Sequence, residues 1–544
     1  MAPLASISLF AAASTEFIPR TLSWLDYTTL ALYFTVNLLI GWWCARRKKA
    51  QANDYFLGGG RVAWWAAAIS FFCTATSSIS FMALPASSFK GNWMEFGSAP
   101  AQAFAGILVG MIFVGILRRM NMTTIFAYLE RRFGKGTQLV GAALSVMLKV
   151  GGRMSVVLLL PALALSVVTG LNVYLSIIVM GVVTTIYAME GGFEAVIWTD
   201  VMQAGVMSGG IIIAIIYLAN GVDGGLPGII GTAAAAGKFK AVSLDFNFTD
   251  ATVWVFAGMF FGHIFTQLGD QPLMQRMLAT ADEKEARRTV VLGNTIGLAS
   301  SVVFFFVGTA LWAFYNSNPG HLAPGLQMDK IFPYFIANEL PHGVVGLIVA
   351  GLFAVSMGAL SGIINSVAAI VVSDFQKTFR PQSTEAQRVR LAKMTTCLCG
   401  LLATAFAVYL AYLDLESLWK TFLRLTALIG GGFPGVFALG LLTRRANARG
   451  AVTGAIASVF VTGAVQLWTD TSAFLHVFVA ISSCFVIGYV VSILTGGEKK
   501  KGPELAGLTL WDRESSAAAK QAGVGGARGS HFANGVAGKN KTFG

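Results

Sequence analysis

The feature that most constrains this chain is a series of apolar stretches, each long enough to cross the roughly 30 Å hydrocarbon core of a bilayer as a helix. Charged residues make up only 12% of the chain, about half of the roughly 25% that is typical of soluble domains. The sequence therefore predicts an all-α integral membrane protein with about 13 transmembrane helices. The stretches cover residues 24–44, 62–87, 99–117, 139–169, 173–187, 193–219, 253–268, 290–315, 343–372, 394–413, 418–442, 451–468 and 474–494.

The basic residues between these stretches are distributed asymmetrically. One set of alternate loops contains clusters of Lys and Arg, whereas the other set contains isolated residues such as Lys90 and Lys330. Because cytoplasmic loops carry the Lys/Arg excess, we expect the clustered side to be cytoplasmic in a multi-pass protein of the cell (inner or plasma) membrane. This arrangement accounts for the net charge of +13 without a nucleic-acid partner. The clusters lie at 46–49, 118–135, 284–288, 377–393, 444–449 and 499–501.

Both ends of the chain differ from its apolar body. Residues 1–23 have no basic segment ahead of their weakly apolar part, so we expect no cleaved signal peptide. Because the number of predicted spans is odd and the basic loops are expected to be cytoplasmic, we expect an extracytoplasmic N-terminus. Residues 497–544 are polar and rich in Gly, Ala and Ser, which predicts a flexible cytoplasmic tail.

Motifs for chemistry on a substrate are absent from the sequence. It contains no Walker loop, nucleophile elbow or HExxH zinc motif, and its five cysteines lie in or beside apolar stretches. We therefore predict that the protein is not an enzyme and has no organic cofactor. The expected partners are a small-molecule solute and the lipid bilayer, with no obligate protein partner evident, and an ion gradient is the expected energy source.

Polar groups inside the apolar stretches are candidates for function, because such groups are costly in lipid unless they face protein or a cavity. Hydroxyl groups concentrate between Cys73 and Ser80. They indicate either side chains bonded to the preceding helical turn or an unwound helix that faces a cation and a solute. Asp200 lies about 10 Å into its stretch and is either a contact between helices or a cation ligand or gating carboxylate.

The remaining polar groups have similarly open interpretations. Arg153, one turn after Lys149, is suited to a bidentate contact with a solute carboxylate, but a buried ion pair with another helix is equally compatible. His263 and Gln267 share one helix face and belong either to the packed core or to a polar cavity. Arg424 is left without a predicted role.

Several motifs occur in a characteristic order between residues 27 and 494. They are DYFLGG (54–59) before Trp64 and Trp65, YLERRFG (128–134), GGFEAVIWTDVMQ (191–203), Asp270-Gln271 with Gln275-Arg276, and Asn365-Ser366. In these motifs the chain resembles the sodium/solute symporters, the family of the sodium-coupled glucose, proline and sialic acid transporters. The segment 152–170 looks most like the sialic acid branch.

The resemblance implies a LeuT-like fold with an inverted repeat of two five-helix halves. The implied organisation is an extra first helix at 24–46, a ten-helix transport core at 62–442 and two additional helices at 443–496. Solute and ion would bind at the middle of the membrane, beside the broken first helix of each half.

The resemblance also implies contacts for a solute, which we expect to be a carboxylate or sugar acid such as sialic acid. In the sialic acid branch the residue that matches Arg153 binds the substrate carboxylate. Ser77 and Ser80 match hydroxyl positions, whereas Ala75 replaces a hydroxyl. The full set of predicted solute contacts is Ser77, Ser80, Gln102, Arg153, His263 and Gln267.

The sodium positions implied by the resemblance are incomplete. Two of them are serines in the family but fall at Gly358 and Ala359 in this chain, so about two of five ligands lack a side-chain oxygen. A second sodium position, matched by Asp200 and Ser361, could persist. The implied positions of the first site are Cys73, Thr76, Val355, Gly358 and Ala359.

We therefore predict a secondary active transporter that moves a small organic solute together with a cation by alternating access, with Na⁺ as the expected coupling ion. The first alternative keeps the fold but couples to protons through Asp200 or is an uncoupled facilitator, because Gly358 and Ala359 lack hydroxyls. A transporter-like solute sensor is a weaker alternative, since residues 497–544 contain no recognisable signalling output.

Overall fold

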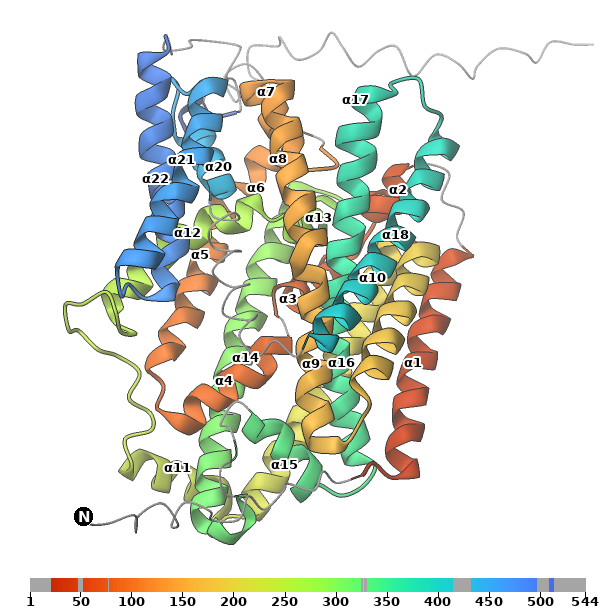
Figure 1. Cartoon of the computed structure of the whole chain (residues 1–544), viewed down its shortest axis with the longest axis vertical. Coiled ribbons are helices and arrows are strands. Elements are labelled where there is room, and N and C mark those ends of the chain that lie inside the picture. Colours follow the sequence, from red (N-terminus) through yellow and green to blue (C-terminus); the bar gives the residue numbers. More distant parts are fainter. Residues whose placement is uncertain are drawn as a thin grey trace, which may run out of the picture.

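The computed structural model of the chain is helical, with no β-strand among the residues that it describes (Figure 1). The helices lie side by side in one bundle, with α1 at one edge of the view and α21 and α22 together at the opposite edge. The described residues are 21–46, 52–76, 78–120, 122–323, 326, 330–413, 432–496 and 508–512.

Helices of very different lengths build the bundle. In the first half of the chain they are α1 (Trp24–Ala45), α2 (Ala52–Leu57), α3 (Trp64–Ala75), α4 (Ser78–Lys90), α5 (Ser98–Ile112), α6 (Val114–Arg119), α7 (Phe126–Phe133), α8 (Lys135–Leu148), α9 (Met154–Thr169), α10 (Val173–Asn220) and α11 (Gly225–Ala235). In the second half they are α12 (Val253–Gly269), α13 (Gln271–Leu278), α14 (Glu283–Ser317), α15 (Ile331–Glu339), α16 (Val344–Ile370), α17 (Lys377–Phe379), α18 (Glu385–Tyr412), α20 (Gly432–Leu442), α21 (Ala448–Trp468) and α22 (Ala473–Leu494).

The predicted all-α membrane architecture is confirmed. Eight described helices are each long and apolar enough to cross a membrane, or nine if a bent pair near the start of the chain counts as one span. All of the predicted apolar stretches contain helix, although the stretch 418–442 is described only from Gly432 onward. Some stretches fall short of a full span: 62–87 is divided into α3 and α4, and 253–268 forms only the shorter helix α12, which is followed after a break by α13.

Two breaks leave non-helical backbone inside the bundle. Thr76 leaves the helical conformation between α3 and α4 (φ −86°, ψ 127°), and Asp270 does so between α12 and α13 (φ −90°, ψ 101°).

The sequence predicts two spans between residues 173 and 219, and both belong to α10. The two arms meet at Gly192, whose φ of 56° and ψ of −151° are accessible to glycine but strained for other residues. A Cβ atom at the neighbouring Gly191 would lie 3.1 Å from the carbonyl oxygen of Gly41 in α1. The two glycines therefore allow α10 to bend and α1 to approach the bend closely.

Helix α16 is the centre of the bundle. Of its most apolar window, 94% is buried inside the protein, against 28% for α21 and α22. Asp26 of α1 accepts hydrogen bonds from the backbone N–H groups of Gly343 (2.7 Å) and Gly346 (2.8 Å) at the N-terminal end of α16. A carboxylate there satisfies donors that the helix itself leaves free and complements the helix dipole.

Helices α10 and α18 are joined by a reciprocal contact of small residues, which we call the Gly–Thr interlock. Gly181 of α10 lies against the side chain of Thr404 in α18, and Gly400 of α18 lies against Thr185 in α10. Each threonine hydroxyl donates to the carbonyl of the glycine one turn earlier in its own helix, at 2.6 Å for Thr185 and 2.8 Å for Thr404. Small residues of this kind let helices pack closely where lipid gives no hydrophobic drive to associate.

We expect Gly181→Val to destabilise the protein by about 1–3 kcal/mol, because the new side chain must displace Thr404 in a packed interface. The measurement is the melting temperature of the purified protein in detergent. Gly205→Val in the same helix is the matched control, since a Cβ atom at Gly205 has no neighbouring atom within 4 Å in the described structure. Equal losses at the two positions would contradict the interlock.

Candidate solute and cation site

A polar cavity lies beside the break between α3 and α4. It encloses about 130 Å³ among α3, α4, α5, α12 and α14. Three predicted solute contacts, Ser80, Gln102 and Gln267, line it together with Thr76 and Asn294. Gln267 Nε2 donates to Asn294 Oδ1 at 2.7 Å. This hydrogen bond fixes the orientation of the two side-chain amides. The break thus brings hydroxyl and amide groups from several helices to one small space.

The other predicted solute contacts are not on the lining of this cavity. Ser77 lies outside the described residues. His263 is partly buried on α12, about one turn before Gln267, and does not belong to the described lining. Arg153 lies on a π-helical turn (Lys149–Arg153) that joins α8 to α9, a type of irregularity that is frequent at functional sites.

Arg153 faces the second helix break, where it meets an aspartate. Its Nη1 atom lies 3.4 Å from Oδ2 of Asp270, and the two side chains are 37% and 17% exposed. Lys149, buried on the same turn, donates to Ser145 Oγ at 2.9 Å. Asp270 makes no side-chain cap to α13. The carboxylate at the break is therefore held by the arginine of α8–α9 and is within reach of solvent.

Asp200 forms a fully buried ion pair. Its Oδ2 atom lies 3.4 Å from Nη2 of Arg276 in α13, and both side chains are 0% exposed. Ser70 of α3 donates to the same carboxylate oxygen and accepts from Arg276 Nε at 3.1 Å. Because a lone buried charge is very costly, Asp200 and Arg276 depend on each other and tie α3, α10 and α13 together.

Two buried oxygen atoms beside this pair have no hydrogen-bond partner among the described residues: Asp200 Oδ1 and Gln203 Oε1. A Cβ atom on Gly358 of α16 would lie 3.0 Å from the first and 2.9 Å from the second. Gln203 Nε2 donates to Asn37 Oδ1 at 3.0 Å, which orients the amide oxygen toward Gly358. Both oxygens therefore point at a position of α16 that has no side chain.

The other predicted sodium positions surround this cluster. Cys73, at the end of α3, lies next to Gly358 and its Sγ contacts the carbonyl oxygen of Asp200 at 3.4 Å. Ser361 Oγ donates to the carbonyl oxygen of Gly358 at 3.0 Å. Val355 and Ala359 are buried in α16, whereas Thr76 faces the small cavity. The structure thus gathers α3, α10 and α16 around two buried oxygen atoms that have no hydrogen-bond partner among the described residues. Oxygen is the ligand type that suits Na⁺.

Comparison with known proteins decides the family. The sequence model of the sodium:solute symporter family matches residues 55–458. The chain belongs to this family. The symporter is similar to the sodium/sialic acid symporter NanT of Aliivibrio fischeri, with 33% identity over 86% of this chain and 93% of the relative. It is also similar to the sodium/sialic acid symporter SiaT of Proteus mirabilis, with 33% identity over 90% and 98%.

Solved structures agree on the fold. A substrate-bound, outward-open Na⁺-coupled sialic acid symporter superposes with a TM-score of 0.82 at 31% identity, over 88% of this chain and 100% of that chain. The nucleobase-cation-symport-1 transporter Mhp1 superposes with a TM-score of 0.52 at 12% identity, over 85% and 99%, which supports the fold alone. The LeuT-like architecture is thereby confirmed.

Family membership establishes the general activity. The protein is a membrane transporter that couples movement of a small solute to sodium, and it is not an enzyme. The proton-coupled and uncoupled alternatives, raised by the missing hydroxyls at Gly358 and Ala359, are not favoured by these relatives.

Three residues that the structure places in the candidate site were not assigned a role by the sequence interpretation: Gln203, Asp270 and Arg276. All three lie inside recognised motifs. Gln203 follows Asp200 by three residues, which places both on one helix face, so periodicity alone could have indicated it. The pairing of Arg276 with Asp200 joins residues 76 positions apart and has no local signal.

We expect Arg276→Met to destabilise the symporter by about 3–5 kcal/mol, because it leaves Asp200 as an uncompensated buried charge. The double variant Asp200→Asn/Arg276→Met removes both charges and should recover part of the loss. Melting temperature and size-exclusion profile are the measurements, and Arg287→Met, which removes one partner of the exposed Glu283 pair, should cost little. A double variant less stable than Arg276→Met would contradict the pairing.

Proposed function

We propose that this symporter carries sialic acid, or a sugar acid of the same class, together with Na⁺. The observation that carries the proposal is Arg153: a partly exposed guanidinium on an irregular turn within an apolar stretch, facing the break at Asp270. An arginine can hold a carboxylate through two parallel hydrogen bonds. The names of the two relatives, sodium/sialic acid symporters, support the same solute.

The dimensions of the polar cavity support a change of shape during transport. Its volume of about 130 Å³ is smaller than the roughly 300–1,000 Å³ of pockets that enclose ligands of this size. A sugar acid therefore needs the space around Ser80, Gln102 and Gln267 to enlarge. Separation of the helices beside the two breaks would provide that space, in keeping with alternating access around a site at the middle of the membrane.

Without a solute, the carboxylate of Asp270 occupies the position beside Arg153 that the solute carboxylate is proposed to take. Its oxygen already lies 3.4 Å from Arg153, so an incoming carboxylate must exchange with it. Helix α9 packs against α10, α16 and α18, whereas α12 packs against α5, α20 and α22. Exchange of Asp270 for a solute would release a link between these two groups of helices and so connect solute binding to their relative movement.

The coupling ion is proposed to bind among Asp200, Gln203 and the turn of α16 that begins at Gly358. Asp200 Oδ1 and Gln203 Oε1 supply buried oxygens without a partner among the described residues, and Gly358 leaves room between them and α16. Ser361 lies on the same turn. In this arrangement a neighbouring amide oxygen compensates for the missing hydroxyl at Gly358.

The topology proposed for the symporter follows its charges. Loops with clustered Lys and Arg face the cytoplasm of the cell membrane, the N-terminus (1–23) lies outside and the tail (497–544) inside. Residues 62–442 form the transport core, preceded by the helix at 24–46 and followed by the two helices within 443–496.

In proteoliposomes we expect labelled sialic acid to accumulate with an inward Na⁺ gradient but not with a proton gradient or with no gradient. Asp200→Asn/Arg276→Met, which removes the charged ligand without leaving Arg276 unpaired, should raise the Na⁺ concentration for half-maximal uptake roughly tenfold. Gly358→Ser should also raise the Na⁺ concentration for half-maximal uptake, since the serine Cβ would crowd Asp200 Oδ1 and Gln203 Oε1. Gly205→Ser is the control, because a Cβ atom at Gly205 has no neighbouring atom within 4 Å in the described structure, and it should leave this concentration unchanged. Accumulation driven by protons would refute the proposed coupling.

Arg153→Ala should raise the KM for sialic acid roughly tenfold or more, because a charge-assisted hydrogen bond is worth about 1.5–3 kcal/mol. Asp270→Asn should lower the KM, because an amide competes less well for Arg153. The methyl ester of sialic acid, which lacks the carboxylate charge, should be a poor substrate and insensitive to both substitutions. Equal transport of the acid and the ester would exclude the carboxylate contact, whatever the solute.

A further inference from the structure

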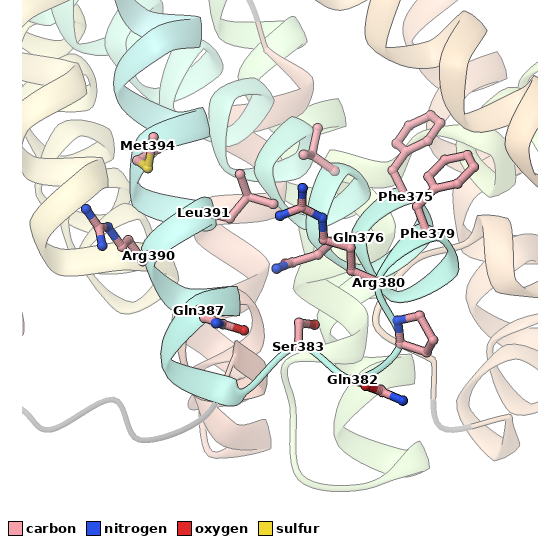
Figure 2. A pocket seen from close by; sticks show the side chains of 12 residues that line it. Phe375, Gln376, Phe379, Arg380, Gln382, Ser383, Gln387, Arg390, Leu391 and Met394 are labelled. Carbon is pink, nitrogen blue, oxygen red and sulfur yellow. The ribbon is translucent and has the colours of Figure 1, made fainter.

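A second, more open pocket lies far from the solute site, where the end of α16 meets the start of α18 (Figure 2). It has a volume of about 890 Å³. One wall is the π-helical turn Val371–Gln376 with α17, the other wall is the first turns of α18, and the loop 380–384 closes one end. The pocket opens at the end of the bundle that carries the clustered basic residues.

The charges of this region are divided between paired and unpaired groups. Arg388 is paired with Glu385 at 2.5 Å, and Lys393 with Glu190 at 2.8 Å. Arg380 and Arg390, the two basic residues that line the pocket, have no carboxylate partner among the described residues. Two exposed guanidinium groups without counter-ions form a site of positive charge that can attract an anion.

The two arginines are placed on opposite walls. Figure 2 shows Arg380 and Gln376 directed into the space between the helices, toward Leu391 of α18. Arg390 is directed to the far flank of α18, where an adjoining pocket begins that is also lined by Lys393, Met394 and Cys397. A ligand in the pocket would therefore meet one guanidinium inside it and a second at its edge.

The rest of the lining combines polar side chains (Gln376, Gln382, Ser383 and Gln387) with apolar ones, and the apolar part continues along the outer face of α18. Val371, Phe375, Leu391 and Met394 line the pocket itself. Beyond it, Met394, Leu398 and Leu401 are each more than half exposed and recur at helical spacing on one face. Such a face suits lipid acyl chains, so the pocket connects a basic end to a hydrocarbon-facing stripe.

We propose that this pocket binds one anionic phospholipid, with its phosphate at Arg380 inside the pocket, its negative charge also attracted by Arg390 at the edge, and its acyl chains along Leu391, Met394 and Leu398. A basic pocket between membrane helices on the cytoplasmic side matches the headgroup of an anionic lipid. A soluble anion would leave the apolar walls without a partner, and a zwitterionic lipid would bring a cation beside two guanidinium groups. This site is independent of the proposed solute and coupling ion.

The test is native mass spectrometry of the full-length protein in detergent, titrated with palmitoyl-oleoyl phosphatidylglycerol or the matching phosphatidylcholine. The wild-type protein should retain one phosphatidylglycerol at concentrations at which phosphatidylcholine is lost. Arg380→Gln/Arg390→Gln should weaken this retention roughly thirtyfold, because each basic residue contributes about 1 kcal/mol to attraction of anionic lipid.

The matched control is Arg445→Gln/Arg449→Gln, which removes the same charge from two exposed positions, one between α20 and α21 and one in the first turn of α21. This variant should retain phosphatidylglycerol as the wild type does. An equal loss in the control, equal retention of the two lipids, or displacement by glycerol 3-phosphate at the lipid's own concentration would each overturn the proposal. The first two would indicate non-specific attraction, and the third a soluble anion.

Discussion

The buried pair of Asp200 and Arg276 sets conditions that the surrounding helices must meet. Neither charge is tolerable in the apolar interior alone, so α10 and α13 are held together by their mutual attraction. The guanidinium also requires space, and Gly362 of α16 provides it, since a Cβ atom there would lie 2.8 Å from Arg276 Nη2. Small residues on α16 therefore make a charged centre possible.

The two helix breaks explain how an otherwise apolar bundle brings polar groups together in its interior. At Thr76 and Asp270 the chain leaves the helical conformation, and each break releases side chains that would otherwise face a neighbouring helix. The first break opens onto the cavity with Gln102 and Gln267. The second places Asp270 against Arg153. Irregular backbone at this depth is tolerated because protein, not lipid, surrounds it.

The value of the sequence interpretation differs between particular residues. Ser80, Gln102 and Gln267 were predicted as solute contacts and do line one cavity, but His263, on the same helix as Gln267, does not belong to its described lining. For Arg153 the sequence left a solute carboxylate and a partner on another helix as alternatives. The structure shows that a partner, Asp270, is present, and the two alternatives are compatible if one carboxylate replaces the other.

The sequence by itself determined that the protein lies in a lipid bilayer, and it determined the class of fold and the family. Apolar stretches of membrane length, alternating basic loops and ordered local motifs are properties of consecutive residues, so they can be recognised without coordinates. Only the tertiary structure decided which polar groups meet. Three pairs of partners are far apart in the chain: Asp200 with Arg276, Arg153 with Asp270, and Gln203 with Gly358. Their contacts depend on where helices bend and cross. A shift of one residue along a helix rotates its side chain by about 100°, so such pairings follow from packing and not from composition.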